Sequence, residues 1–184
     1  MTKLVWSFLN TFLSRGFSTV FAVIVGNLLL PETLGYYITF ILVVDYVGSI
    51  LCIQTDDAIV YTLNNVHNKV RSAYFFAGWV SVTGIACVVT VLACFLSSYL
   101  AVLFDVTARQ EMLVFCLPLI ILKTNRLFFN KVMHADLRLK EETIVNLCAA
   151  VIQVLISIIL LLSGYRLAGA LVAVYCGDIA GVAL

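Results

Sequence analysis

The sequence predicts an all-α, polytopic membrane protein, a single bundle of about six transmembrane helices with a cytoplasmic N-terminus. Of its 184 residues, 63% are hydrophobic and only 11% are charged. A soluble domain is nearer half apolar and a quarter charged, so this chain has too little polar surface to fold in water. The lipid bilayer is therefore its expected partner. A spanning helix needs about 20 apolar residues. Such stretches occur near residues 4–30, 36–53, 73–97, 112–129, 144–162 and 167–184.

The links between these stretches predict how neighbouring helices run. The stretch at 4–30 is too long for a signal peptide and has no small-residue cleavage site, so we expect it to stay as a helix. Pro31, Glu32 and Thr33 end it. Residues 163–166 form a tight turn between the fifth and sixth stretches. Links this short predict antiparallel neighbours.

The distribution of basic residues predicts the orientation in the membrane. One set of lysines and arginines lies at the N-terminus and in two longer links, near 54–72 and 130–143; it comprises Lys3, Lys69, Arg71, Lys131, Arg138 and Lys140. The opposite side has only Arg109 and Arg166. Cytoplasmic loops carry the excess of positive charge, so the N-terminus and both longer links are expected in the cytoplasm.

The last stretch, residues 167–184, ends without a basic residue to anchor it at the interface. We therefore expect the chain to be part of a longer protein.

Several function classes are disfavoured. The net charge of +1 and the lack of a long basic run argue against a nucleic-acid partner. The six cysteines lie in apolar stretches without CxxC spacing, so we expect buried small hydrophobic residues and no metal or cofactor. Enzyme motifs are missing, and His67 and His134 fall in the predicted cytoplasmic links. The doublet Asp56-Asp57 is expected to solvate a helix end.

A polar stripe in the first stretch is the clearest candidate for function. Its residues follow a spacing that places side chains on one helix face. They are Ser7, Asn10, Thr11, Ser14, Arg15 and Ser18. The stripe either lines a substrate cavity or joins neighbouring helices by hydrogen bonds. Arg15 favours the cavity, because a charge at mid-bilayer costs roughly 2.5–3.5 kcal/mol.

Four further charged residues fall inside the predicted spans. Lys123 and Arg126 share one face of the fourth stretch, beyond Pro118, which predicts a kink. They either bind substrate or extend to the headgroups. Asp45 and Asp178 either couple transport to an ion or pair with Arg15 or Lys123.

A second polar stripe occupies the fifth stretch. It comprises Asn146, Ala149, Ala150, Gln153 and Ser157. Its spacing is typical of interhelical hydrogen bonding, so it is not expected to form a site.

The segment GNLLLPETLGYY, residues 26–37, resembles the junction between the first two helices of bacterial polysaccharide biosynthesis proteins. Residues 126–184 are similar to the fourth to sixth helices of that family, including the turn at Ser163-Gly164-Tyr165. The family comprises O-antigen and capsule flippases within the multidrug/oligosaccharidyl-lipid/polysaccharide exporter superfamily.

This resemblance implies an alternating-access carrier in the bacterial inner membrane, active in lipopolysaccharide or capsule synthesis. It would move a polyprenyl-pyrophosphate-linked glycan to the outer leaflet, and the cationic, hydroxyl-rich stripe around Arg15 would suit that substrate. Members usually have two bundles of six or seven helices, and this chain supplies one. The resemblance therefore implies that the chain is the N-terminal lobe of a larger transporter, whose partner would be a second copy or a missing C-terminal lobe. Two alternatives stay open: a cation-coupled drug exporter using Asp45 and Asp178, and a non-transporting scaffold or inactive fragment.

Overall fold

The computed structural model describes residues 2–52, 61–62 and 68–183. It is 91% helical, and no strand occurs among those residues. Six helical segments of the described chain are long and apolar enough to cross a membrane. They are Phe8–Leu28, Pro31–Leu51, Val70–Phe95, Thr107–Ala135, Leu139–Leu162 and Arg166–Ala183. The predicted all-α, multi-pass class is confirmed.

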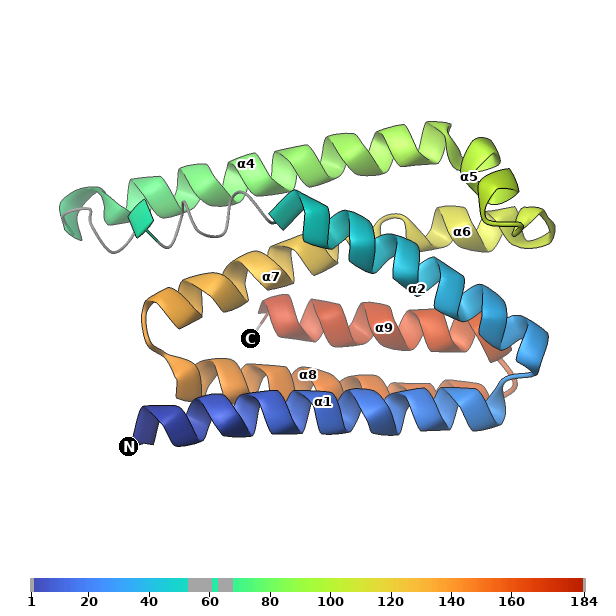
Figure 1. Cartoon of the computed structure of the whole chain (residues 1–184), viewed down its shortest axis with the longest axis horizontal. Coiled ribbons are helices and arrows are strands. Elements are labelled where there is room, and N and C mark those ends of the chain that lie inside the picture. The colour runs from blue at the N-terminus through green and yellow to red at the C-terminus, as the bar shows by residue number, and fades with distance from the viewer. Residues whose placement is uncertain (1, 53–60, 63–67, 184) are drawn as a thin grey trace. The chain divides into compact units, whose positions relative to one another are not determined.

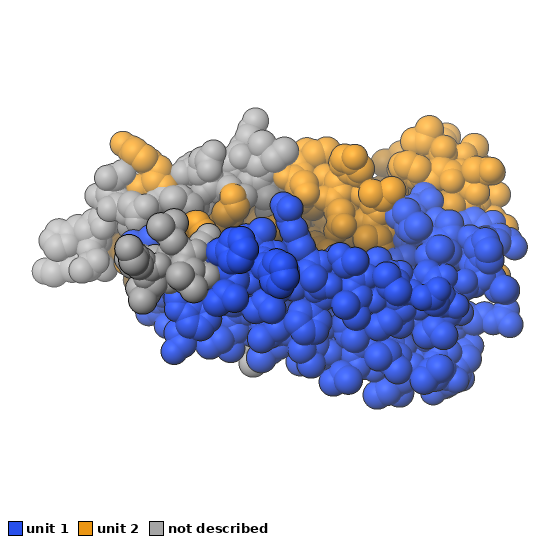
Figure 2. Space-filling model, turned by 60° about the horizontal axis from the view of Figure 1, so that its bottom comes forward, with its two compact units in different colours: residues 1–40, 137–184 blue, residues 41–136 orange. Residues whose placement is uncertain are grey.

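The chain divides into two compact units, which Figure 2 colours blue and orange. Unit 1 comprises Met1–Phe40 and Leu137–Leu184, and unit 2 comprises Ile41–Asp136. The boundary falls inside helix α2 (Pro31–Cys52), so each unit contains part of that helix. The single bundle expected from the sequence stays a prediction.

Unit 1 is built on helix α8. This helix (Leu139–Leu162) packs along α1 (Thr2–Leu28) and along α9 (Arg166–Ala183), as Figure 1 shows. Small residues let helix backbones approach closely in a membrane. At Gly177 of α9, an added Cβ atom would lie 2.8 Å from the Cβ atom of Gln153 in α8. The close contact between α8 and α9 therefore depends on the absence of a side chain at Gly177.

Helix α2 begins at Pro31, five residues before the predicted start at residue 36. Proline suits the first turn because its φ is already helical and its missing N–H would have no acceptor there. Glu32 lies in the same turn, where the helix dipole favours negative charge. The Thr33 hydroxyl donates to the Leu30 carbonyl at 2.8 Å. The expectation that these three residues form a link was wrong.

The predicted turn between α8 and α9 is confirmed. Gly164 has a positive φ of 89°. Its N–H donates to the Leu161 carbonyl, and the Tyr165 N–H donates to the Leu160 carbonyl, both at 3.1 Å. These two bonds form a Schellman motif, which satisfies carbonyls at the helix end. Glycine is favoured here because a side chain strains this backbone conformation.

Unit 2 is organised around two helices that pack along each other, α4 (Asn68–Phe95) and α7 (Leu119–Ala135). The chain between them forms the short helix α5 (Ser97–Leu103), the 3₁₀ turn Thr107–Arg109 and helix α6 (Gln110–Cys116). Helix α4 begins and ends earlier than the predicted stretch 73–97. It ends earlier because the chain turns at Leu96 into α5.

Aromatic rings fill part of the contact between α4 and α7. The Phe75 ring centroid lies 5.7 Å from that of Phe128 and 6.2 Å from that of Phe129. Aromatic pairs at such separations are worth about 0.5–1.5 kcal/mol beyond their buried area. This cluster holds α7 against α4.

The chain interrupts its helix at Pro118, the residue where the sequence predicts a kink. Helix α6 ends at Cys116 and α7 begins at Leu119, so one membrane segment is built from two helical pieces. Proline has no N–H to donate and its ring clashes with the preceding turn. The N–H of Ile121 instead donates to the Pro118 carbonyl at 3.1 Å, a tighter turn.

The second long link, expected at 130–143, is much shorter than predicted. Only residues 136–138 separate α7 from α8. Lys131 and His134 continue α7, whose C-terminal end favours positive charge, and Glu141 and Glu142 lie in the first turn of α8. Charged residues here extend helices rather than interrupt them. His67 and the Asp56-Asp57 doublet lie outside the described residues.

The cytoplasmic N-terminus predicts the labelling of two exposed positions. In a cysteine-free background, a cysteine at Arg138, between α7 and α8, should react with a membrane-impermeant maleimide only from the cytoplasmic side. A cysteine at Thr107 should react only from the opposite side, because one membrane segment separates the two positions. Labelling of intact and inverted vesicles measures both. The reverse pattern would refute the predicted orientation.

Candidate functional site

Arg15 lies midway along α1, and its side chain is exposed. Its backbone carbonyl accepts a hydrogen bond from the Thr19 hydroxyl at 2.9 Å. Among the described residues of unit 1, its guanidinium has no hydrogen-bond or ion-pair partner. Thr11 and Ser18, on the same polar face, are also exposed. This part of the predicted stripe therefore presents a cation and hydroxyls outward from α1.

Asn10, on the same stripe, has a different environment. Its side-chain amide donates to the Glu142 carboxylate at 2.9 Å, and its Oδ1 accepts from the Asn146 amide at 3.5 Å. Glu142 and Asn146 both belong to α8, and Glu142 is only 7% exposed. Asn10 thus joins two helices, which is the alternative that the sequence left open. Ser7 and Ser14 belong to α1, but their side chains lie outside the described part of the structure.

Glu142 is a buried polar residue that the sequence analysis missed. It was placed in the link 130–143, whereas it lies in the first turn of α8. A helical spacing of four residues puts it on the same face as Asn146, so extending the predicted helix by one turn would have found it. Its carboxylate completes a polar contact between α1 and α8.

Lys123 and Asp45 form an ion pair in unit 2. The Lys123 Nζ lies 3.1 Å from the Asp45 Oδ1. Helix α7 supplies the lysine and α2 supplies the aspartate. Of the alternatives that the sequence left open for Asp45, pairing with Lys123 is the one found. Arg126 follows three residues later on α7 and is partly buried.

Asn125 anchors the part of α7 that carries Lys123. Its Oδ1 accepts from the Trp79 indole N–H at 2.7 Å and from the Thr83 hydroxyl at 2.9 Å, both on α4. Its amide donates to the Ile121 carbonyl at 2.8 Å. Both the oxygen and the amide nitrogen of the Asn125 side chain thus have hydrogen-bond partners, and the residue is buried. This network holds the backbone beside Lys123 against α4.

Asn125→Leu should therefore destabilise unit 2. The change removes two hydrogen bonds across the α4–α7 contact and leaves the Trp79 N–H without its acceptor. We expect a loss of about 1–3 kcal/mol, measured by unfolding in detergent. Cys148→Leu, at an exposed position of α8, serves as the control and should change stability little. Equal stability of both variants would show that the network contributes nothing.

Asp178, in α9, is 2% exposed and lies in the interior of unit 1. It follows Gly177, where an added Cβ atom would lie 2.8 Å from the Cβ atom of Gln153 in α8. A carboxylate buried this deeply is not open to a bulky substrate.

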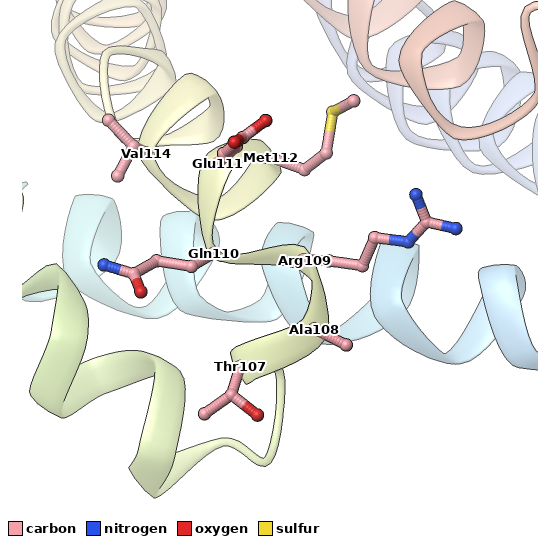
Figure 3. Close-up of a pocket in the computed structure, with 7 residues that line it drawn as sticks. All are labelled: Thr107, Ala108, Arg109, Gln110, Glu111, Met112 and Val114. Atoms are coloured by element: carbon pink, nitrogen blue, oxygen red, sulfur yellow. The ribbon is translucent and has the colours of Figure 1, made fainter.

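An open pocket of about 570 Å³ lies beside the 3₁₀ turn before α6. One short stretch of chain provides its lining, residues 107–112 and Val114 (Figure 3). The Arg109, Gln110 and Thr107 side chains point in different directions from this segment. Because they do not converge, the pocket does not assemble a binding site.

The described residues contain no group of three or more histidine, cysteine or acidic side chains that could hold a metal ion. The five cysteines whose side chains are described are free thiols. Cys116 is buried, whereas Cys87 and Cys148 are exposed, so the expectation that all cysteines are buried was wrong. A thiol is apolar enough to face lipid.

No family model matches the chain, and neither a curated protein nor a solved structure matches it. The assignment to the flippase family, which rests on residues 26–37 and 126–184, therefore stays a prediction. The residues themselves must carry the argument for function.

Proposed function

We propose that this protein moves an anionic, lipid-linked oligosaccharide precursor across the bacterial inner membrane by alternating access. The observation that supports this function best is the position of Arg15. It lies about 10 Å from the start and about 20 Å from the end of the candidate membrane span Phe8–Leu28, and it is exposed there.

An exposed arginine at this depth needs a polar environment. Facing lipid would cost roughly 2.5–3.5 kcal/mol on insertion scales, and the side chain is too short to reach the headgroups easily from mid-helix. Arg15 has no described partner in unit 1 that would neutralise it. It therefore faces water or a polar ligand during function.

The chemistry of this face suits an anionic glycolipid. A guanidinium binds phosphate through two parallel hydrogen bonds, and this geometry makes arginine well suited to a pyrophosphate. The hydroxyls of Thr11 and Ser18 are exposed beside it and match the many hydroxyls of a glycan. An inert scaffold would gain nothing from keeping this charge exposed.

The drug-exporter alternative has less support. It requires acidic groups that are open to a cationic substrate. The charge of Asp45 is balanced by Lys123 at 3.1 Å, and Asp178 is buried. The exposed charge midway along α1, which has no described partner in unit 1, is positive.

A flipping assay tests the proposal directly. The full chain is reconstituted into vesicles with a fluorescent, polyprenyl-pyrophosphate-linked sugar, and a membrane-impermeant quencher reports how much of the probe faces outward. The protein should accelerate its exchange between leaflets, whereas a fluorescent phosphatidylcholine should exchange at the rate of empty vesicles. Uptake of a cationic dye, measured in parallel, reports the exporter alternative. Dye transport without flipping, or neither activity, would refute the proposal.

A further inference from the structure

The ion pair between α2 and α7 lies at membrane depth. Asp45 is about two turns from the end of α2, and Lys123 is more than three turns from either end of its membrane segment, Thr107–Ala135. The side chain of Asp45 is 46% exposed and that of Lys123 is 27% exposed. The pair is thus neither at the interface nor enclosed in the protein.

This pair leaves hydrogen-bonding capacity unused on its exposed side. The ammonium group has three donors and the carboxylate has two acceptor oxygens, yet one contact joins them. Neither side chain has another hydrogen-bond partner among the described residues of unit 2. Lipid cannot supply the missing bonds, so the exposed side must face water or a polar ligand.

The backbone that carries Lys123 is held firmly, whereas its charged end is not. Asn125 ties α7 to Trp79 and Thr83 of α4. On α2, Gly48 brings the backbone close to α7, since an added Cβ atom would lie 3.7 Å from the Lys123 Cβ atom. The base of Lys123 therefore contacts α2 at Gly48 and follows the backbone that Asn125 ties to α4, so its Nζ atom can exchange partners without moving that backbone.

We propose that Lys123 is an anion-binding residue and that Asp45 is its resident counter-ion, which a phosphate or pyrophosphate group displaces. The substrate class rests on the proposed function. In the unloaded state, Asp45 prevents a bare cation at membrane depth, which would be costly. An incoming phosphate offers more oxygens and more charge than one carboxylate. When the phosphate leaves, Asp45 recovers Lys123 and so favours release.

Binding measurements test this exchange without requiring transport. The full chain is placed in phosphatidylcholine nanodiscs, and farnesyl pyrophosphate is the probe. Asp45→Asn removes the competing charge and should tighten binding about fivefold, the factor expected for an ion pair near the upper end of the exposed range. Lys123→Met should abolish binding. Glu141→Gln, which removes the carboxylate of the exposed Arg138–Glu141 pair, is the matched control and should leave the dissociation constant unchanged.

Further arms identify the source of the anion. Inorganic pyrophosphate that competes through Lys123 assigns the site to the phosphate group itself. Competition by phosphatidylglycerol in the nanodisc, lost in Lys123→Met, assigns it to a phospholipid headgroup. Both results support an anion site with Asp45 as counter-ion, provided that the competing anion binds more tightly to the Asp45→Asn variant than to the wild type.

The proposal is overturned if Asp45→Asn binds farnesyl pyrophosphate no more tightly than the wild type. Should that variant not accumulate, two others decide. Lys123→Arg keeps the cation and should still bind. The double variant Asp45→Asn, Lys123→Met removes both charges, should fold, and should not bind. Wild-type binding by the double variant also overturns the proposal. Failure of flipping with intact Lys123-dependent binding would refute the proposed function alone.

Discussion

Arg15→Ala should abolish flipping of the lipid-linked sugar while the protein still accumulates in the membrane at normal levels. The change removes the exposed cation midway along α1, which lacks a described partner in unit 1, and no described carboxylate of that unit loses an ion pair. Hydrogen bonds to charged groups contribute about 1.5–3 kcal/mol, so binding of the pyrophosphate should weaken about 10- to 100-fold. The vesicle assay measures flipping, and immunoblotting measures abundance.

Lysine at the same position separates charge from geometry. Arg15→Lys keeps the positive charge but loses the planar pair of donors, so its activity should lie between those of the wild type and Arg15→Ala. Arg138→Ala is the matched control, because Arg138 is exposed between α7 and α8 and pairs only with its neighbour Glu141 among the contacts described for that turn. It should flip normally.

Two other outcomes would change the interpretation of Arg15. A fall in abundance, recovered when Asp178→Asn is added, would make Arg15 a structural partner of that carboxylate. Full flipping by Arg15→Ala at normal abundance would remove Arg15 from the mechanism altogether.

Gly177→Ala should destabilise the protein, although alanine is the better helix former. The new Cβ atom would lie 2.8 Å from the Gln153 Cβ atom, closer than real Cβ contacts, so α8 and α9 must separate. Overpacking of this kind costs about 1–3 kcal/mol. Thermal unfolding in detergent, followed by the loss of monodisperse protein, measures the effect.

The matched control for this substitution has the opposite expected sign. Gly84 lies within α4, and nothing lies within 4 Å of the position where its Cβ atom would be. Gly84→Ala should therefore leave stability unchanged or raise it by up to about 1 kcal/mol, the difference in helix propensity. If both variants behave alike, the close approach at Gly177 does not contribute to stability.

The sequence was sufficient for the number of membrane segments and for two interruptions of the chain. An apolar run of spanning length has one low-energy conformation in a bilayer, the α-helix, because a helix satisfies its own backbone hydrogen bonds. Pro118 and Gly164 impose local backbone conformations that need no tertiary partner. Helix ends were less predictable, as Pro31 and Glu142 show, because a polar residue can either begin a helix or lie in a link.

The polar residues required the tertiary structure. Periodicity placed Asn10 and Arg15 on one stripe, yet Asn10 bonds to α8 and Arg15 is exposed. Spacing specifies the face of a helix but not the side from which a neighbour approaches. Likewise, the free-energy cost of burying a charge predicted that Asp45 needs a cationic partner, and the sequence offered both Arg15 and Lys123. The contact of α2 with α7 at Gly48 places the Lys123 Nζ 3.1 Å from the Asp45 Oδ1. The sequence could not choose between the two cations, because an ion pair depends on the distance between helices that are remote in sequence.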